Sequence, residues 1–213
     1  MAPERDLERV RGAQARLEDA IAGLDDTGTR EASLLPGWTV GHVLTHLARN
    51  ADSHRRRADA AGRGEVVEQY PGGAAGRAAE IDGGAGRSAD ELRRDVETSA
   101  EALSISWAIL AEDAWERPTL DVMGRERPLH DLVGRRWQEL EVHGIDLGIG
   151  LTPRWWSADF VHDRLPVLRM TLPGRLGPGA RAPEAATLDE RDELAWLYGR
   201  LHRADLPELA PWD

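Results

Sequence analysis

Residues 35–48 read LPGWTVGHVLTHLA and predict the start of a long amphipathic helix. Thr39 is typical of a helix N-cap, because its side-chain oxygen can accept the hydrogen bond of a free backbone N–H. Apolar residues follow at the spacing of one helix face, namely Val40, Val43, Leu44, Leu47 and Ala51. This pattern predicts a helix that runs from the cap to about Ala61.

Other segments with the same apolar spacing predict further helices on both sides of this one. Ser88-Ala-Asp-Glu91 is a capping box, in which the serine and glutamate side chains bind each other's backbone N–H groups. This box marks the start of one helix. The predicted segments are residues 4–24, 88–110, 129–147 and 188–201.

The segments between the predicted helices differ in character. Residues 62–87 are rich in glycine and have no helical period, which predicts a long loop. Residues 120–128 predict a turn or a small hairpin, and proline becomes frequent after Gly150. We therefore expect a mainly α protein, with a four-helix bundle in residues 1–150 and a small C-terminal α+β subdomain in residues 151–213.

The composition limits the partners and the chemistry of the chain. A net charge of −11 disfavours binding to nucleic acid and to anionic membranes, and no apolar run approaches the roughly 20 residues of a membrane span. The charged N-terminus does not resemble a signal peptide, so we expect a cytoplasmic protein, either a monomer or a homodimer. Because cysteine is absent, a metal site must use His, Asp and Glu, and any thiol must come from outside the protein.

Glu139 and His143 are candidates for such a site. They lie four residues apart, so a helix places them one turn apart on one face. Leu132, Leu140 and Leu147 lie close to that face, which predicts that it points towards the core. A buried Glu and His need partners, and a divalent metal would satisfy both. By itself, the pattern Glu-x-x-x-His is more common at surfaces and helix ends than in metal sites.

The helix predicted to begin after residue 39 carries three histidines, His42, His46 and His54. His46 lies at the edge of the inward face and is best placed to meet Glu139 and His143. The alternative is a local two-histidine site of His42 and His46, although we expect His42 and His54 to be solvated. Two histidines and one carboxylate leave a coordination position open, as in catalytic sites. Zinc suits these ligands best, and nickel or iron would accept them too.

Residues 35–48 resemble the opening signature of the mycothiol-dependent maleylpyruvate isomerase N-terminal domain, which belongs to the DinB-like superfamily. In this family the histidine before Leu-Ala is a metal ligand, and it corresponds to His46. The Glu-x-x-x-His motif of the last bundle helix supplies the other two ligands, which correspond to Glu139 and His143. The resemblance thus implies a DinB-like bundle with a divalent metal on these three residues.

Two further segments share this resemblance, and each contains an arginine. The stretch that includes Tyr70, Arg77 and Ile81 is similar to the family's loop after the second helix. Residues 196–212, which include WLYGR, LPEL and a last tryptophan, are similar to the closing motif, where the Gly-Arg step implies a functional role for Arg200. Family members usually have a longer C-terminal domain, so we expect this one to be shortened.

The two arginines are candidates for substrate and cofactor binding. Arginine offers a bidentate fork to a carboxylate, so we expect Arg200 and Arg77 to be catalytic residues that hold the carboxylates of the substrate. Arg200 is also the candidate for cofactor binding. The alternative for both is a plain surface charge, because the chain has no lysine and arginine serves everywhere in its place.

The resemblance also implies an activity. It is a metal- and mycothiol-dependent cis–trans isomerisation of maleylpyruvate or a similar unsaturated acid, by addition and elimination of the thiol. The expected partners are therefore a small-molecule substrate and a low-molecular-weight thiol, with zinc as the metal. Two alternatives use the same bundle. The first is a related enzyme, either a mycothiol S-transferase that acts on an electrophilic small molecule or an isomerase of a biosynthetic pathway. The second is a DinB-like metal-binding protein without turnover.

Overall fold

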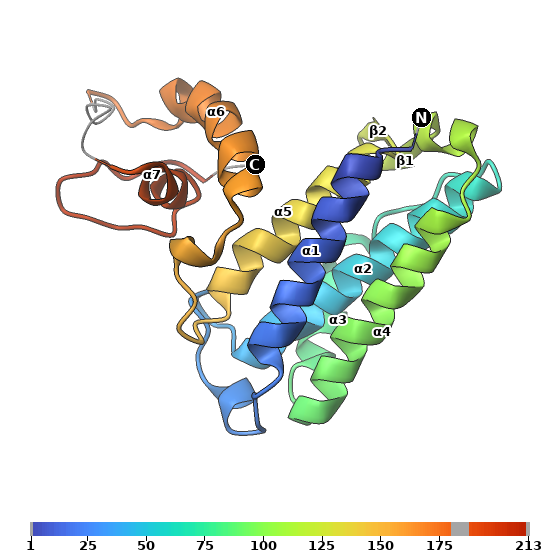
Figure 1. Cartoon of the computed structure of the whole chain (residues 1–213), viewed down its shortest axis with the longest axis horizontal. Coiled ribbons are helices and arrows are strands. Elements are labelled where there is room, and N and C mark those ends of the chain that lie inside the picture. Colours follow the sequence, from blue (N-terminus) through green and yellow to red (C-terminus); the bar gives the residue numbers. More distant parts are fainter. Residues whose placement is uncertain (1, 180–187, 212–213) are drawn as a thin grey trace. The chain divides into compact units, whose positions relative to one another are not determined.

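Helices dominate the structure, a computed structural model that describes residues 2–179 and 188–211. The chain divides into two units, residues 1–150 and residues 151–213 (Figure 1). Among the described residues, no helix is both long enough and apolar enough to cross a membrane. Trp212, which belongs to the predicted closing motif, lies outside the described residues.

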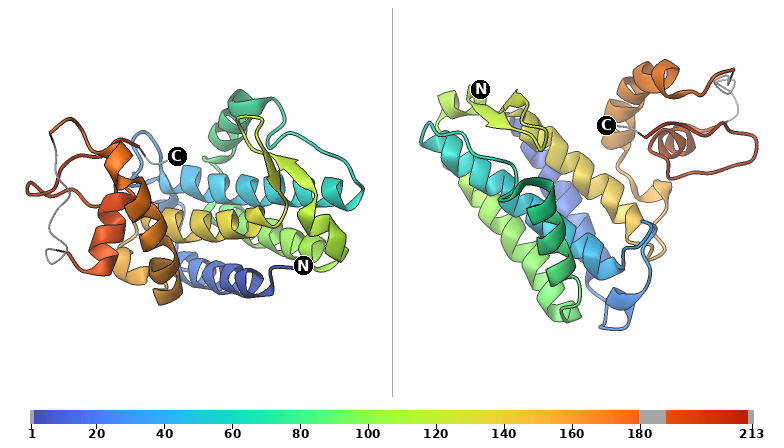
Figure 2. Two further views of the ribbon diagram at one scale, coloured as in Figure 1. Left: turned by 90° about the horizontal axis from the view of Figure 1, so that it is seen from above. Right: turned by 180° about the vertical axis from the view of Figure 1, so that it is seen from behind.

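The N-terminal unit is a bundle of four long helices, α1, α2, α4 and α5, and α3 packs against α2 (Figures 1 and 2). The most extensive contacts join α2 to α4 and α1 to α5. The mainly helical, bundle-type fold predicted from the sequence is therefore confirmed. The helices are α1 (Glu4–Ile21), α2 (Val40–Gly62), α3 (Gly73–Gly84), α4 (Ala89–Ala108) and α5 (Asp131–Asp146).

Local sequence signals set the starts of α2 and α4. The Thr39 side chain accepts a hydrogen bond from the His42 backbone N–H, and the His42 ring accepts one from the Thr39 N–H. Ser88 and Glu91 form the same reciprocal pair at α4. Both predicted N-termini are confirmed, because each cap satisfies backbone donors that the first helical turn leaves unpaired.

The predicted inward faces of α2 and α5 form the bundle core. On α2 the apolar stripe from Val40 to Ala51 is at most 1% exposed. On α5 the predicted leucines are equally buried, so that face points inward as expected. The buried apolar residues of the two faces are Val40, Val43, Leu44, Leu47, Ala51, Leu132, Val133, Leu140 and Leu147.

The prediction of a continuous loop over residues 62–87 is wrong, because α3 lies within it. This helix consists mainly of alanine and glycine, and Ile81 is its buried residue. Small residues hide the helical period, but they allow close packing on α2. A Cβ atom at Gly84 would lie 2.6 Å from Thr45 Cγ2, so only glycine fits there without displacement. The helix is thus held by tertiary contact more than by its own periodicity.

A short hairpin connects α4 to α5, as the sequence predicted. Strand β1 (Pro118–Leu120) pairs antiparallel with β2 (Glu126–Pro128), with Thr119 opposite Arg127. One-turn 3-10 segments occur at Gly28–Arg30, Glu112–Glu116 and Pro153–Trp155.

The C-terminal unit contains α6 (Ala158–Arg175) and α7 (Glu190–Leu197). We did not predict α6, because Pro166 and Pro173 lie inside it and proline normally interrupts a helix. Its start is capped by the Ser157 side chain, which accepts a hydrogen bond from the Phe160 N–H, and several apolar residues of α6 are buried. Helix α7 ends earlier than predicted. Within the described part of this unit, β structure is limited to one isolated bridge between Leu176 and Leu209.

Candidate metal centre

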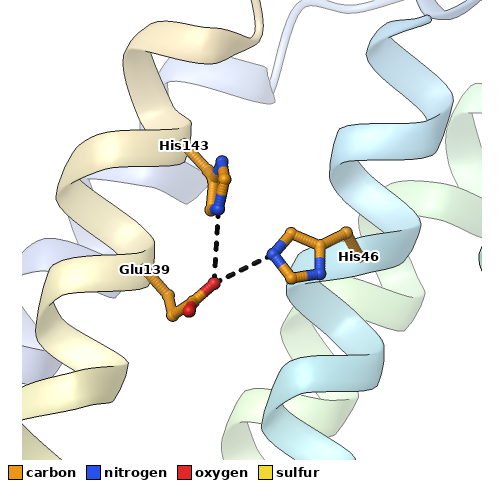
Figure 3. Close-up of side chains that lie close together, drawn as sticks. All are labelled: His46, Glu139 and His143. Carbon is orange, nitrogen blue, oxygen red and sulfur yellow. Dashed lines mark hydrogen bonds and ion pairs between the residues drawn. The ribbon is translucent and has the colours of Figure 1, made fainter. Parts of the chain in front are cut away.

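Three predicted ligands converge in the interior of the bundle. His46 on α2 points towards Glu139 and His143 on α5 (Figure 3). Glu139 Oε2 lies 2.9 Å from His46 Nε2 and 3.3 Å from His143 Nε2. One potential ligand atom of each residue lies within 4.8 Å of the others. Two helices distant in sequence therefore bring together the side chains that the spacing singled out.

Burial and mutual contact shift the pKa values of this triad, His46, Glu139 and His143. Burial lowers the pKa of His46 to about 4, although its hydrogen bond to Glu139 acts in the opposite direction. Burial also disfavours charge on His143, but hydrogen bonds to Asp146 and Glu139 outweigh it and raise its pKa to about 9. Burial likewise opposes the charge of Glu139, yet hydrogen bonds from both histidines hold its pKa well below its usual range. The triad thus keeps a carboxylate charged between two imidazoles.

Asp146 is a member of the site that the sequence reasoning missed. Its Oδ2 lies 2.8 Å from His143 Nδ1, and its side chain is buried. A carboxylate on one ring nitrogen fixes the orientation of a histidine whose other nitrogen binds a metal. The spacing His143-x-x-Asp146, which places both on one helix face, is the signal that could have revealed it.

Arg77 lies beside the triad, as a predicted site residue should. Its Nη2 is 3.1 Å from His46 Nδ1, and its guanidinium lies 5.7 Å from the centre of the Tyr70 ring. Helix α3, which was not predicted, carries Arg77 into this position. The contact makes Nδ1 of His46 an acceptor, so the ring proton sits on Nε2 and is donated to Glu139.

The other histidines of α2 have different surroundings. His42 caps the helix and retains 22% exposure of its side chain, so it is not part of the triad. The expectation of a solvated His54 is wrong, because it is 2% exposed. Its position on the helical wheel does not show this burial, because neighbours such as Gln69 and Asp121 are distant from it in sequence. Trp38 lies next to the triad, with its ring centre 5.7 Å from that of His46.

Arg200 belongs to the C-terminal unit. Its backbone N–H donates to the Ala195 carbonyl at 2.7 Å, and its Nη1 donates to the Tyr198 carbonyl at 2.8 Å. The structure thus brings His46, Glu139, His143 and Arg77 together within one unit, and the role of Arg200 stays a prediction.

The triad fits a divalent cation by the chemistry of its donors. Ligands about 2.1 Å from a zinc ion at tetrahedral angles lie roughly 3.4 Å apart, which small side-chain adjustments would reach from the observed contacts. The donors are two imidazole nitrogens and a charged carboxylate, and Asp146 already orients one ring. Such a set suits zinc, and it leaves a coordination position for another ligand.

Fold and triad together define a helical-bundle protein with an internal two-histidine, one-carboxylate cluster. More specifically, the chain belongs to the mycothiol maleylpyruvate isomerase N-terminal domain family, whose sequence model matches residues 10–148. This confirms the family that the motifs predicted.

Two solved structures share the fold. They are crystal structures of the mycothiol-dependent maleylpyruvate isomerase and of a mutant of it in which a histidine is replaced by alanine. Each is 24% identical to this chain, with a TM-score of 0.84 over 100% of this chain and 98% of the other. The expected shortening of the C-terminal subdomain is therefore wrong relative to these structures. No curated protein matches the chain.

Proposed function

We propose that this protein is a metal- and mycothiol-dependent enzyme that isomerises maleylpyruvate, or a similar unsaturated acid, from cis to trans. The observation that carries the proposal is the triad of His46, Glu139 and His143, in which His46 is buried and the other two are half-buried, in the bundle of a member of this family. The solved structures of the same fold are named for that reaction, which supports the assignment.

The chain's own residues would hold the metal and keep it in place. His46 and His143 supply imidazole nitrogens, Glu139 supplies a charged oxygen, and Asp146 keeps the His143 ring turned towards them. When bound, the cation would supply a Lewis acid that lowers the pKa of a coordinated thiol. Burial of His46 lowers the local dielectric and strengthens these electrostatic effects.

The proposed reaction is a reversible addition of the thiol to the double bond. The deprotonated thiol forms one C–S bond, and the electron pair of the C=C bond moves onto the oxygen of the adjacent carbonyl group, which leaves a single bond about which the molecule can rotate. Elimination breaks the C–S bond, restores the C=C bond in the trans form and returns the thiol. The negative charge that develops on the adjacent oxygen needs a positive partner, which is the role proposed for the arginines.

Arg77 is suited to hold a carboxylate of the substrate because of its contact with His46. When Nε2 of His46 binds a cation, Nδ1 carries the ring proton and no longer accepts a hydrogen bond. The guanidinium of Arg77 would then be released to hold a carboxylate of the substrate. Arg200 is proposed as the positive partner of the negative charge that develops during the addition and as the contact to mycothiol.

Metal analysis and an absorbance assay test the proposal. We expect about one zinc per chain and conversion of maleylpyruvate only when mycothiol is added. Product analysis separates the isomerase from a transferase, because the isomerase returns the thiol unchanged and a transferase leaves it bound to the product. Protein that contains the metal but leaves both the substrate and mycothiol unchanged would contradict the proposal.

A further inference from the structure

A small recess of about 50 Å³ adjoins the triad, and Glu139 lines both. On α2, Asn50 and His54 follow His46 at intervals of four residues, which places them on the same helix face. On α5, Arg135 precedes Glu139 by the same interval. The recess therefore continues the site along the bundle axis, and His54 lies about 12 Å along α2 from His46.

Two arginines that line the recess, Arg57 and Arg135, are candidates for contact with an anion. Arg57 is 3% exposed, and its guanidinium donates to the carbonyls of Ser53 at 3.3 Å and Leu120 at 3.2 Å. Its Nη2 is buried and has no hydrogen-bond partner among the described residues. Within the same part of the chain, neither Arg57 nor the exposed Arg135 forms an ion pair with a carboxylate.

The carboxylates that line the recess are already engaged. Asp121 contacts Arg125 at 2.8 Å and Arg127 at 3.3 Å, and Glu139 is held by the histidines of the triad. Burial lowers the pKa of Arg57 to about 10, which still leaves it charged at neutral pH. A buried cation without an anion is costly, so an anionic ligand would be stabilised here.

Two neutral groups add hydrogen-bond donors to these charges. The Oδ1 atom of Asn50 accepts a hydrogen bond from Arg136 at 2.9 Å. Its amide N–H groups therefore remain as the donors that Asn50 can offer to a ligand in the recess. His54 Nδ1 is buried and has no hydrogen-bond partner among the described residues. The volume of the recess admits a few water molecules or a single carboxylate, and not a larger group.

We infer that this recess binds one carboxylate of the dicarboxylate substrate, with Arg57 and Arg135 as charge partners and Asn50 and His54 as hydrogen-bond donors. The inference rests on the proposed function, because it takes the reacting double bond to lie at the triad. The recess lies along the bundle axis from the triad. An extended acid with its double bond at the triad could therefore place the carboxylate that is more distant from the double bond in the recess, between α2 and α5. The recess thus selects for a second carboxylate at a set distance from the double bond.

Arg135→Gln is the main test, since Arg135 is exposed and its loss leaves the core intact. Arg57→Gln is the second variant, and Arg94→Gln on the exposed face of α4 is the control with the same loss of charge. The probes are maleylpyruvate in kinetics, and pimelate and its diamide in binding by calorimetry. Pimelate is a saturated dicarboxylate as long as maleylpyruvate and cannot react.

We expect Arg135→Gln and Arg57→Gln to raise KM and weaken pimelate binding by roughly 10- to 100-fold, with kcat and zinc content little changed. Arg94→Gln should match the wild type. The diamide, which carries no carboxylate, should bind the wild type more weakly than pimelate does, and Arg135→Gln should distinguish the two ligands less than the wild type.

The outcomes separate this inference from the proposed function. If the wild type converts maleylpyruvate and Arg135→Gln keeps the wild-type KM and pimelate affinity, the inference is overturned and the function stands. If maleylpyruvate is not converted but pimelate binding depends on Arg135 and Arg57, the function fails and the carboxylate site stands. If pimelate does not bind the wild type, the recess is not such a site.

Discussion

Helix α2 buries two histidines, His46 and His54, about two turns apart, and their neighbourhoods have opposite character. His46 is 3% exposed and faces a carboxylate and a second imidazole. His54 is 2% exposed and lies near the charges of Arg57 and Arg136. Burial lowers the pKa of both rings, so both are neutral near pH 7. The same side chain at the same depth thus lies in the proposed cation site in one case and in the proposed anion site in the other, because the neighbours differ.

The largest expected effect is the loss of the metal in His46→Ala. Removal of one ligand of three should lower zinc affinity by more than about 100-fold, since even loss of an outer partner costs about 10- to 100-fold. Activity should fall with the metal content. Zinc analysis after dialysis against a weak chelator, together with the maleylpyruvate assay, measures both. A variant that keeps its zinc and its activity would show that the triad is not the metal site.

Asp146→Asn should have a smaller effect on the same site. The change retains the shape of the side chain but removes the charge that orients the His143 ring, so zinc affinity should fall about 10- to 100-fold. Competition with a chromophoric chelator gives the affinity. Asp52→Asn, a half-buried carboxylate on α2 outside the triad, is the matched control and should bind zinc like the wild type. Equal affinities in both variants would remove Asp146 from the site.

His54→Gln tests the second neighbourhood through the pH dependence of stability. Burial holds the pKa of His54 well below the unfolded value of 6.5. Below pH 6.5 the unfolded chain therefore binds a proton that the folded chain does not, and the free energy of unfolding drops as pH falls. The loss is at most about 1.4 kcal/mol per pH unit for this group.

In His54→Gln this component disappears, so stability should fall less steeply between pH 6.5 and pH 5. Urea unfolding of metal-free wild type and variant at several pH values measures the difference, in which the contributions of all other groups cancel. If the free energy of unfolding depends on pH in the same way in both proteins, His54 takes up its proton as readily in the folded state as in the unfolded chain. This result would contradict the lowered pKa of the buried ring.

His42→Ala should have the smallest effect and completes the comparison along α2. The variant loses the ring that accepts the Thr39 N–H, which should cost about 1 kcal/mol of stability. Zinc affinity and activity should stay at the wild-type level, so this variant is also the control for His46→Ala. A loss of zinc in His42→Ala would favour the local pair of His42 and His46 as the metal site.

Much of the bundle could be predicted because its signals are local. The stripe from Val40 to Ala51 and the caps at Thr39 and Ser88 act within a few residues, so periodicity and residue type suffice. Helices α3 and α6 could not be predicted in this way. The first is made of small residues that pack closely, and the second contains prolines whose cost is offset by contacts elsewhere in the C-terminal unit.

The sequence by itself determined the residue types of the candidate metal site, the helix faces that carry them and the family to which the chain belongs. Only the tertiary structure decided that His46 meets Glu139 and His143, that Asp146 orients one ring, and that His54 is buried near the guanidinium groups of Arg57 and Arg136. The physical reason is the distance along the sequence over which each interaction acts. Helical spacing is fixed by bonds between neighbouring turns, whereas burial and charge compensation depend on which distant segments cover a side chain.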